Sequence, residues 1–483
     1  MTLLDIVILK PTLNERLSNW VCGFSWERIP PEVIEDIKLR ILDIVGVMLG
    51  GRSSDLVSSA RKAYTGYAGG SDATIVGFPG KTSLSAAAFV NGVLSSILEF
   101  DDSHVQTGIH STGPVVSAVL PVAQHRGVSG RELIEAVLLG SELTCRLGQV
   151  APGLFHKNGF HPTAVFGIFG AVYALARLQK LSPEVLVNAT GIAGSLAAGG
   201  MASWEDGTSA KSLHVGMAAS GALQAVELAK CGVSGPRPVF DGRFGFFRSH
   251  VQAQGYAFDF DAATRGLGQD WEVLNVAPKA YPCGYVIQPF IDGALELRSA
   301  HRLDPEAIAE ITCLIAEFAV ALVCEPVAEK LRPVNSWHAR VSLQHSVAEA
   351  LVRGELDKRA YAEASLRDAR INALAGKVKY AIDPGAADRT ILTGEIVIRL
   401  KDGRELRHRV PHMRGTRANP MLREDFVAKF TRNAADVVSA RLFARILKGI
   451  LDLEHAENAA PLLRSLSSRS IEVRRESARP RPR

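Results

Sequence analysis

The stretch PPEVIEDIKLRILDIVGVMLGG, residues 30–51, indicates which kind of fold this chain adopts. It begins with two prolines and an acid, and proline is favoured in the first turn of a helix. Apolar side chains then recur at helical spacing, and they are Ile34, Ile37, Ile41, Ile44 and Met48. Gly50 and Gly51 end the pattern. We therefore predict a long helix across this stretch.

Similar helix starts recur through the first half of the chain, at Gly130-Arg131-Glu132, at Pro162 and at Ser182-Pro183-Glu184. The last of these combines a capping serine with a proline and an acid in the first turn. Alanine and glycine dominate residues 191–200 and 216–225, which favours helices packed closely through small residues, although a ligand could also require the close approach. The first half is expected to be a series of helices packed back to back.

The pattern changes after about Trp271. Residues 311–316 and 391–400 are rich in β-branched or alternating residues, and residues 376–382 alternate. Asp402-Gly403 is a hairpin signal before another alternating run. Helical pattern lies between these strands and returns from residue 423 to 453. The sequence thus predicts a smaller α/β domain followed by more helix.

Composition is that of an ordinary globular protein, with 47% hydrophobic and 22% charged residues among 483. The six cysteines show no CxxC and no zinc-type spacing, which favours reduced thiols in the cytoplasm and a metal-free protein. No secretory signal or membrane span is predicted. Seven arginines and two glutamates in residues 464–483 account for the net charge of +5, and we expect a solvated, disordered tail rather than a nucleic-acid or membrane partner.

The densest group of ionisable residues is Glu99-Phe100-Asp101-Asp102-Ser103-His104, followed by His110-Ser111. Such residues are costly to bury unless they are paired or take part in chemistry. Because they lie within an apolar, helix-rich stretch, they form the first candidate for a catalytic centre. No nucleotide-binding glycine signature accompanies them.

Three further residues could join this centre. His161 lies directly before Pro162, so its backbone is extended, and the helix start after it favours a neutral imidazole. Lys211 and Lys279 are cations suited to holding a substrate carboxylate. Taken alone, such a histidine is more often structural and such a lysine more often a surface charge. Their combination with the acidic cluster favours a site.

Six segments resemble, in the same order, the MmgE/PrpD family, which includes 2-methylcitrate dehydratase, cis-aconitate decarboxylase and iminodisuccinate epimerase. They are 98–104, His110-Ser111, 159–163, 211–216, 279–283 and 415–420, and the resemblance extends from about Trp20 to Leu453. It implies a mainly α protein with a large all-helical domain and a smaller α/β lid. It also implies a homodimer, no cofactor, and a site between the domains for a small di- or tricarboxylate.

On this basis we expect a helical domain over residues 1–268, the lid over 269–412, a return to the helical domain over 413–460 and the basic tail over 461–483. The resemblance assigns His110, His161, Asp101 and Asp102 as catalytic candidates. As substrate-binding candidates it assigns Glu99, Ser103, His104, Lys211, Lys279, Tyr281 and His345.

Two departures from the family pattern concern these residues. Glu99 stands where aspartate is common, and His345 replaces or mimics a tyrosine hydroxyl. A third departure is Gln288, where a histidine is common.

These residues predict a cofactor-free lyase that labilises a bond beside a carboxylate. The lysines would neutralise carboxylates and developing enolate charge, while His161 or His110 moves the proton. Asp101 and Asp102 would orient a histidine or cap a helix. We expect dehydration of a 2-methylcitrate-like hydroxy acid, with decarboxylation of cis-aconitate type and epimerisation of iminodisuccinate type as alternatives. The non-enzyme alternative is an inactive binding protein of the same fold.

Overall fold

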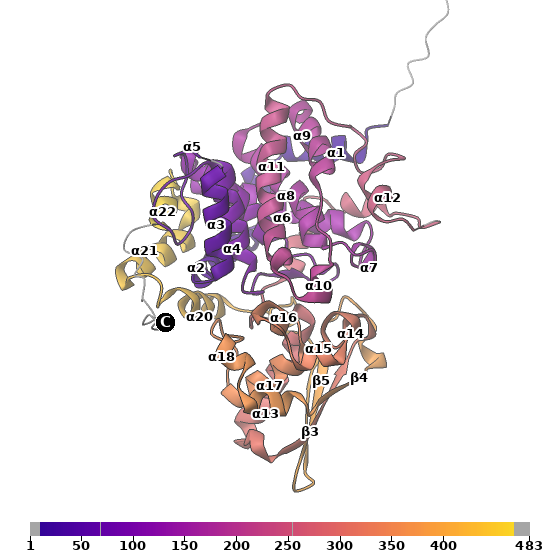
Figure 1. The fold of residues 1–483 in the computed structure, drawn as a ribbon. Coiled ribbons are helices and arrows are strands. Elements are labelled where there is room, and N and C mark those ends of the chain that lie inside the picture. The colour runs from indigo at the N-terminus through magenta and orange to yellow at the C-terminus, as the bar shows by residue number, and fades with distance from the viewer. Residues whose placement is uncertain (1–9, 68, 254, 468–483) are drawn as a thin grey trace, which may run out of the picture.

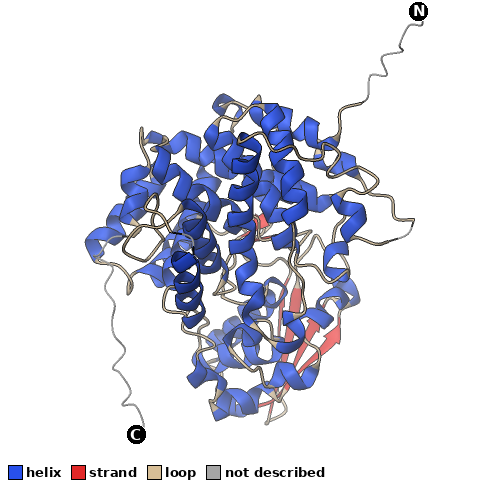
Figure 2. Ribbon diagram, turned by 45° about the horizontal axis from the view of Figure 1, so that its top comes forward, coloured by secondary structure: helices blue, strands red, loops and turns tan. Residues whose placement is uncertain are grey.

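The computed structural model describes residues 10–67, 69–253 and 255–467, and these form a mainly helical protein. Helices make up 58% of the structure, and a small mixed sheet lies in the C-terminal region (Figures 1 and 2). The predicted fold class, mainly α with a smaller α/β part, is confirmed. The division at residues 268 and 412 stays a prediction.

The first half of the chain builds the larger, upper part of Figure 1. Its helices are α1 (Leu13–Cys22), α2 (Pro31–Gly50), α3 (Asp55–Tyr67), α4 (Leu84–Ser96), α5 (Thr112–Arg126), α6 (Gly130–Gln149), α7 (Leu154–Lys157), α8 (Pro162–Gln179), α9 (Pro183–Leu196), α10 (Ser203–Asp206), α11 (His214–Lys230) and α12 (Phe246–His250). The predicted starts of α2, α8 and α9 are confirmed, each with proline in its first turn. Ser129 begins α6 with a capping box to Glu132, which satisfies backbone donors at both residues.

Helices α4 and α11 meet through two glycines. A Cβ placed on Gly92 would lie 2.5 Å from the Gly216 Cα, and one on Gly216 would lie 2.4 Å from the Phe89 carbonyl oxygen. Any side chain at either position would therefore push the helices apart. Ser96 Oγ also donates to the Ser212 carbonyl oxygen at 3.0 Å. This contact fixes the end of α4 against the start of α11.

The smaller α/β part lies below the helices in Figure 1. Its sheet has the order β4-β3-β5-β6, with β3 (Ile308–Ile315) parallel to β4 (Val378–Ile382) and antiparallel to β5 (Gly394–Leu400). β5 and β6 (Glu405–Val410) form the predicted hairpin, and Gly403 in its turn has a φ of +90°. The helices of this part are α13 (Gln288–His301), α14 (Glu317–Val323), α15 (Val327–Leu331), α16 (Ser336–Arg340), α17 (Leu343–Arg353), α18 (Glu363–Leu366) and α19 (Ala369–Ala375). Of these, α13 and α17 pack against the sheet.

The chain then returns to the helical part through α20 (Arg423–Ala434), α21 (Ala440–Leu451) and α22 (Ala460–Ser465). α20 packs on α2, and Lys429 Nζ lies 2.8 Å from Asp43 Oδ1 and donates to the Phe100 carbonyl at 2.9 Å. The predicted disordered tail does not begin at residue 461. Leu463 and Leu466 are buried because α22 packs on the helical part, and residues 468–483 lie outside the described residues.

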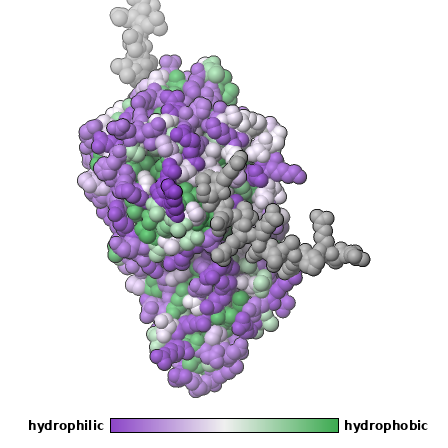
Figure 3. All heavy atoms as spheres, turned by 90° about the vertical axis from the view of Figure 1, so that its left-hand side faces the viewer, coloured by the Kyte–Doolittle hydropathy of each residue, from purple (hydrophilic) through white to green (hydrophobic). Residues whose placement is uncertain are grey.

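Patches of apolar side chains interrupt the hydrophilic surface on the face shown in Figure 3. Among the helices of the described residues, none combines the length and the apolar character that crossing a bilayer requires. The expected homodimer and cytoplasmic location stay predictions.

Candidate active site

Local backbone geometry brings the acidic motif to the lysines. Glu99 follows α4 by three residues and Lys211 precedes α11 by three, so the glycine contact between these helices places the two side chains together. The short strand β1 (Ser103–His104) pairs with β2 (Val276–Ala277), which places Lys279 beside Glu99 and Asp101. The structure thus gathers residues that are far apart in the sequence.

Glu99 is the centre of this cluster. Its carboxylate accepts a hydrogen bond from Lys211 Nζ and another from Lys279 Nζ, the latter at 3.2 Å, while Lys279 also donates to the Glu99 carbonyl at 3.0 Å. Burial raises the pKa of Glu99, but the two ammonium groups outweigh it and hold this pKa well below its usual range. Glu99 has a φ of +52°, an unusual conformation for a residue with a side chain. Lys279 thus holds the Glu99 backbone through its carbonyl, and both lysines stabilise its negative charge.

His110 is held in one tautomer. Its Nδ1 lies 2.5 Å from the Asp102 carbonyl oxygen, which can only accept, so Nδ1 carries the proton. Nε2 is thereby left with a lone pair and lies 3.7 Å from Glu99 Oε1. Ser103 Oγ is 2.9 Å from the same Nδ1. The backbone of the acidic motif, rather than a carboxylate, orients this histidine.

The two aspartates differ. The Asp102 carboxylate accepts from Arg40 Nη1 at 3.3 Å and from the Thr112 hydroxyl, so it anchors the start of α5. Asp101 is fully buried, and neither of its carboxylate oxygens has a hydrogen-bond partner among the described residues. Lys279 Nζ lies 3.9 Å from Asp101 Oδ1. Asp101 therefore contributes its charge to the cluster directly.

Burial keeps the neighbouring histidines neutral. It lowers the pKa of His161 well below the usual value, and the positive charge of Lys211 lowers it further. Burial likewise lowers the pKa of His110, an effect that Asp101 opposes, and brings those of His156 and His214 to about 4. His161 Nδ1 is 3.1 Å from His214 Nδ1, so one ring donates to the other. The site offers neutral imidazoles next to ammonium groups.

These residues surround a small cavity, the inner cavity, of about 50 Å³. Its ionisable lining from the helical part is Glu99, His110, His156, His161 and Lys211. The α/β part adds mainly apolar side chains and Tyr285.

Gly108 and Arg340 shape this cavity. A Cβ on Gly108 would lie 3.0 Å from Tyr285 Oη and 3.3 Å from His156 Cε1, so only glycine lets these two side chains approach. Arg340 Nη1 donates to the carbonyls of Leu98 and Pro282 at 2.9 and 3.0 Å. It thereby ties the α/β part to the acidic motif.

One atom each from Glu99, Asp101 and His110 lie within 4.8 Å of one another, a spacing that could hold a cation. The Lys279 ammonium group already lies among the two carboxylates. A metal ion there would be repelled by Lys211 and Lys279, so the residues present do not fit a metal site.

Five predicted substrate-binding residues are not among those that line the inner cavity, and they are Ser103, His104, Lys279, Tyr281 and His345. His104 pairs with Thr107 and Glu272, and Tyr281 donates to Asp292 at 2.7 Å. His345 is buried within the α/β part, with its Nε2 3.4 Å from Glu349 Oε2 and away from this cavity's lining, so its expected role in place of a hydroxyl donor stays a prediction.

Conversely, sequence reasoning missed His156, His214, Trp204 and Tyr285. His214 lies within a motif segment already noted, and Tyr285 lies two residues after another.

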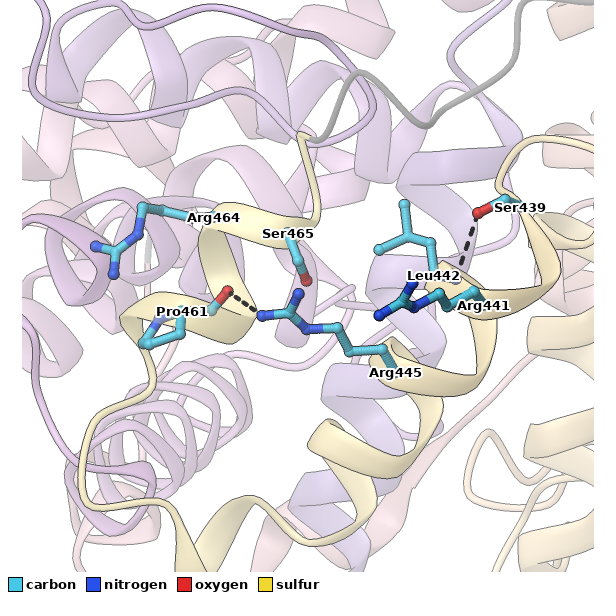
Figure 4. A pocket seen from close by; sticks show the side chains of 7 residues that line it. All are labelled: Ser439, Arg441, Leu442, Arg445, Pro461, Arg464 and Ser465. Carbon is cyan, nitrogen blue, oxygen red and sulfur yellow. Dashed lines mark hydrogen bonds between the residues drawn. The ribbon is translucent and has the colours of Figure 1, made fainter.

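A larger cavity lies elsewhere, between α21 and α22, with a volume of about 560 Å³ (Figure 4). Its charged lining consists of Arg441, Arg445 and Arg464, and Figure 4 shows the Arg464 guanidinium directed away from the other two. Among the described residues, no histidine or acid lines it, so those residues offer no group for proton transfer at neutral pH. The inner cavity is therefore the candidate site for the chemistry.

The fold and the inner cavity define a mainly helical protein equipped for acid/base chemistry on an anion. Family models cover most of the chain, because the MmgE/PrpD N-terminal domain matches residues 15–259 and the MmgE/PrpD C-terminal domain matches residues 281–453. The chain belongs to the MmgE/PrpD family of enzymes, which confirms the resemblance found in the sequence.

Named relatives are similar along nearly their whole length. A cis-aconitate decarboxylase-like protein of Aspergillus oryzae is 26% identical over 475 residues, covering 94% of this chain and 97% of that protein. The cis-aconitate decarboxylase of Homo sapiens is 26% identical, covering 93% of this chain and 94% of that protein. That of Aspergillus terreus is 24% identical, covering 95% of this chain and 96% of that protein.

Proposed function

We propose that this protein is a lyase that removes CO₂ from a small tricarboxylate of the cis-aconitate kind. The observation that carries the proposal is the placement of two buried ammonium groups, Lys211 and Lys279, beside the imidazoles of His110 and His161. The full-length relatives are named as cis-aconitate decarboxylases or as similar to them. These names favour the decarboxylase alternative over the dehydration expected from the sequence.

The reaction breaks the bond between a carbon and its carboxylate. The electron pair stays on the substrate as an enolate-like carbanion, CO₂ leaves, and the carbon takes a proton. The ammonium groups of Lys211 and Lys279 stabilise the developing charge, since fixed charges in a buried site need no reorganisation. The proton comes from an imidazolium at His110 or His161, whose rings lie 6.1 Å apart.

Proton NMR in D₂O tests the reaction class. Purified protein is incubated in parallel with cis-aconitate and with 2-methylcitrate. We expect cis-aconitate to lose CO₂ and gain one deuterium on carbon, and 2-methylcitrate to stay unchanged. Loss of water from 2-methylcitrate, without decarboxylation of cis-aconitate, would contradict the proposal and restore the dehydratase hypothesis. No reaction in either tube would favour the binding protein.

The pH dependence provides an independent test. A decarboxylase needs an imidazolium donor, and burial lowers the pKa values of His110 and His161 in the free enzyme. We therefore expect kcat/KM to fall as pH rises through a pKa below the ordinary histidine value of about 6.5.

Bound substrate changes this pKa in a known direction. Its carboxylates stabilise the imidazolium, so the profile of kcat should fall at a higher pH than that of kcat/KM. A dehydratase that begins by removing a proton would show the opposite limb, because kcat/KM would then fall as pH decreases.

A further inference from the structure

A second cavity, the outer cavity, adjoins the inner one. Its volume is about 350 Å³, and it shares His156, Tyr285 and Leu322 with the inner cavity, which measures about 50 Å³. Ligand pockets usually measure about 300–1,000 Å³. The inner cavity alone lacks the room for a tricarboxylate, so part of a bound substrate extends toward the outer cavity.

The inner cluster carries no surplus positive charge. Lys211 and Lys279 face the carboxylates of Glu99 and Asp101, which balance them in number. The histidines add none, because burial first and Lys211 second lower the pKa of His161, and the pKa values of His156 and His214 are about 4. A substrate with three negative charges requires additional cations.

The outer cavity supplies two such cations, Lys157 and Arg389. Neither has a carboxylate within 4.0 Å among the residues that the structure describes. Arg389 is held instead by its surroundings, with its guanidinium 4.4 Å from the centre of the Phe318 ring and its Nη1 2.9 Å from where a Cβ on Gly153 would lie. Its fork of donors stays available for a carboxylate, which guanidinium groups bind with two parallel hydrogen bonds.

These cations come from opposite sides of the cavity. Lys157 ends α7 in the helical part, and Arg389 lies in the segment between β4 and β5 of the α/β part. The charge of Arg389 also reaches the shared wall. At His156 it adds to burial in lowering the pKa, and at Tyr285 it opposes the rise in pKa that burial causes. The outer cavity is thus electrostatically continuous with the catalytic groups.

We propose that Lys157 and Arg389 form an outer carboxylate-binding subsite, which holds the substrate carboxylate farthest from the reacting carbon. This inference rests on the proposed function, because it assigns the third carboxylate of the same substrate. It makes Arg389 a specificity-determining residue that distinguishes tricarboxylates from dicarboxylates.

The test uses Arg389→Gln, Lys157→Gln and the double variant in the full chain. Lys401→Gln is the matched control, because it removes one positive charge from an exposed residue of the β5–β6 turn. Calorimetry measures binding of tricarballylate, a saturated tricarboxylate, and of glutarate, a dicarboxylate. Steady-state kinetics with cis-aconitate give kcat and KM separately, and circular dichroism checks folding.

We expect each single variant to weaken tricarballylate binding about 10- to 100-fold, as for a lost hydrogen bond to a charged group, and to change glutarate binding less than threefold. KM for cis-aconitate should rise in proportion while kcat stays within about threefold, and Lys401→Gln should match the wild type.

Two outcomes would overturn the subsite in different ways. If the wild type and the variants bound tricarballylate equally well, the subsite would be refuted and the proposed function would stand. Wild-type protein that binds neither acid and does not turn over cis-aconitate would refute both.

Discussion

The two sides of the inner cavity are built differently. The helical side provides Glu99, His110, His161 and Lys211 just outside the ends of helices, two of which, α4 and α11, meet through glycine contacts, whereas the α/β side provides mostly apolar walls and Tyr285. Groups that transfer protons need positions fixed within fractions of an ångström, and close-packed helices supply such positions. Under the proposed function, the comparison teaches that the helical side would perform the chemistry, while the α/β side would set the size of the cavity and access to it.

The largest expected effect is the loss of a proton-transferring histidine. His110→Gln and His161→Gln should each lower kcat about 10²- to 10⁴-fold, because either imidazole takes part in proton transfer. Turnover of cis-aconitate measures this effect, and the thermal unfolding midpoint checks that the fold is kept. The exposed His301→Gln is the matched control and should keep full activity. Near-normal turnover in both His110→Gln and His161→Gln would contradict the assignment of proton transfer to the helical side.

The second prediction concerns the buried ion pair on the helical side. Lys211→Met should lower the free energy of unfolding by about 3–5 kcal/mol, because breaking a buried pair leaves the charge of Glu99 partly uncompensated. Adding Glu99→Gln should recover part of this loss. Urea unfolding followed by circular dichroism gives both values.

The exposed pair of Lys180 with Glu132 provides the contrast. Its lysine side chain is 74% exposed, and Lys180→Met should cost less than about 1 kcal/mol. Equal losses for Lys180→Met and Lys211→Met would show that the Glu99 cluster is not specially organised.

A smaller effect is expected from the helix contact that supports the cluster. Gly216→Ala should destabilise the protein by about 1–3 kcal/mol, since the added methyl group meets the Phe89 carbonyl. Gly66→Ala is the control, because no atom lies within 4 Å of a Cβ there and alanine favours helix. If both variants unfolded at the same urea concentration, the close approach of α4 and α11 would not matter to stability.

The smallest effect is expected on the α/β side. Burial raises the pKa of Tyr285 to about 12, although Arg389 opposes the shift, so the phenol keeps its proton at neutral pH. Tyr285→Phe should therefore change kcat less than about tenfold in the same turnover assay. A loss as large as that of His161→Gln would mean that the α/β side also performs chemistry.

Sequence patterns predicted the elements that are governed by local rules. Prolines in the first turn and capping residues marked α2, α8 and α9, and Asp402-Gly403 marked the β5–β6 hairpin, because each signal acts within a few residues. The extent of the C-terminal tail was missed. α22 and the residues just after it depend on burying Leu463 and Leu466 against distant helices, and the arginine-rich sequence that follows conceals this.

The candidate site, too, was predicted only as far as local sequence signals allow. Density of ionisable residues and ordered motifs identified Glu99, His110, His161, Lys211 and Lys279, which the structure brings together. The motifs could not predict which way each side chain points, because a residue next to a site residue in the sequence can face away from the site. His104, Tyr281 and His345 do so. Arg389 belongs to none of the motifs, and it lines the outer cavity only because the loop between β4 and β5 places it there.

The left-handed backbone of Glu99 has an evolutionary consequence. Such a conformation costs roughly 1–3 kcal/mol in a residue other than glycine, and the chain retains it at a point where Lys279 contacts both the carbonyl and the carboxylate. Glycine would relieve the backbone, but it would remove the carboxylate that compensates the ammonium groups of Lys211 and Lys279, and a broken buried pair costs about 3–5 kcal/mol. The larger cost decides the outcome, so a library sorted only for heat resistance should retain an acid at residue 99.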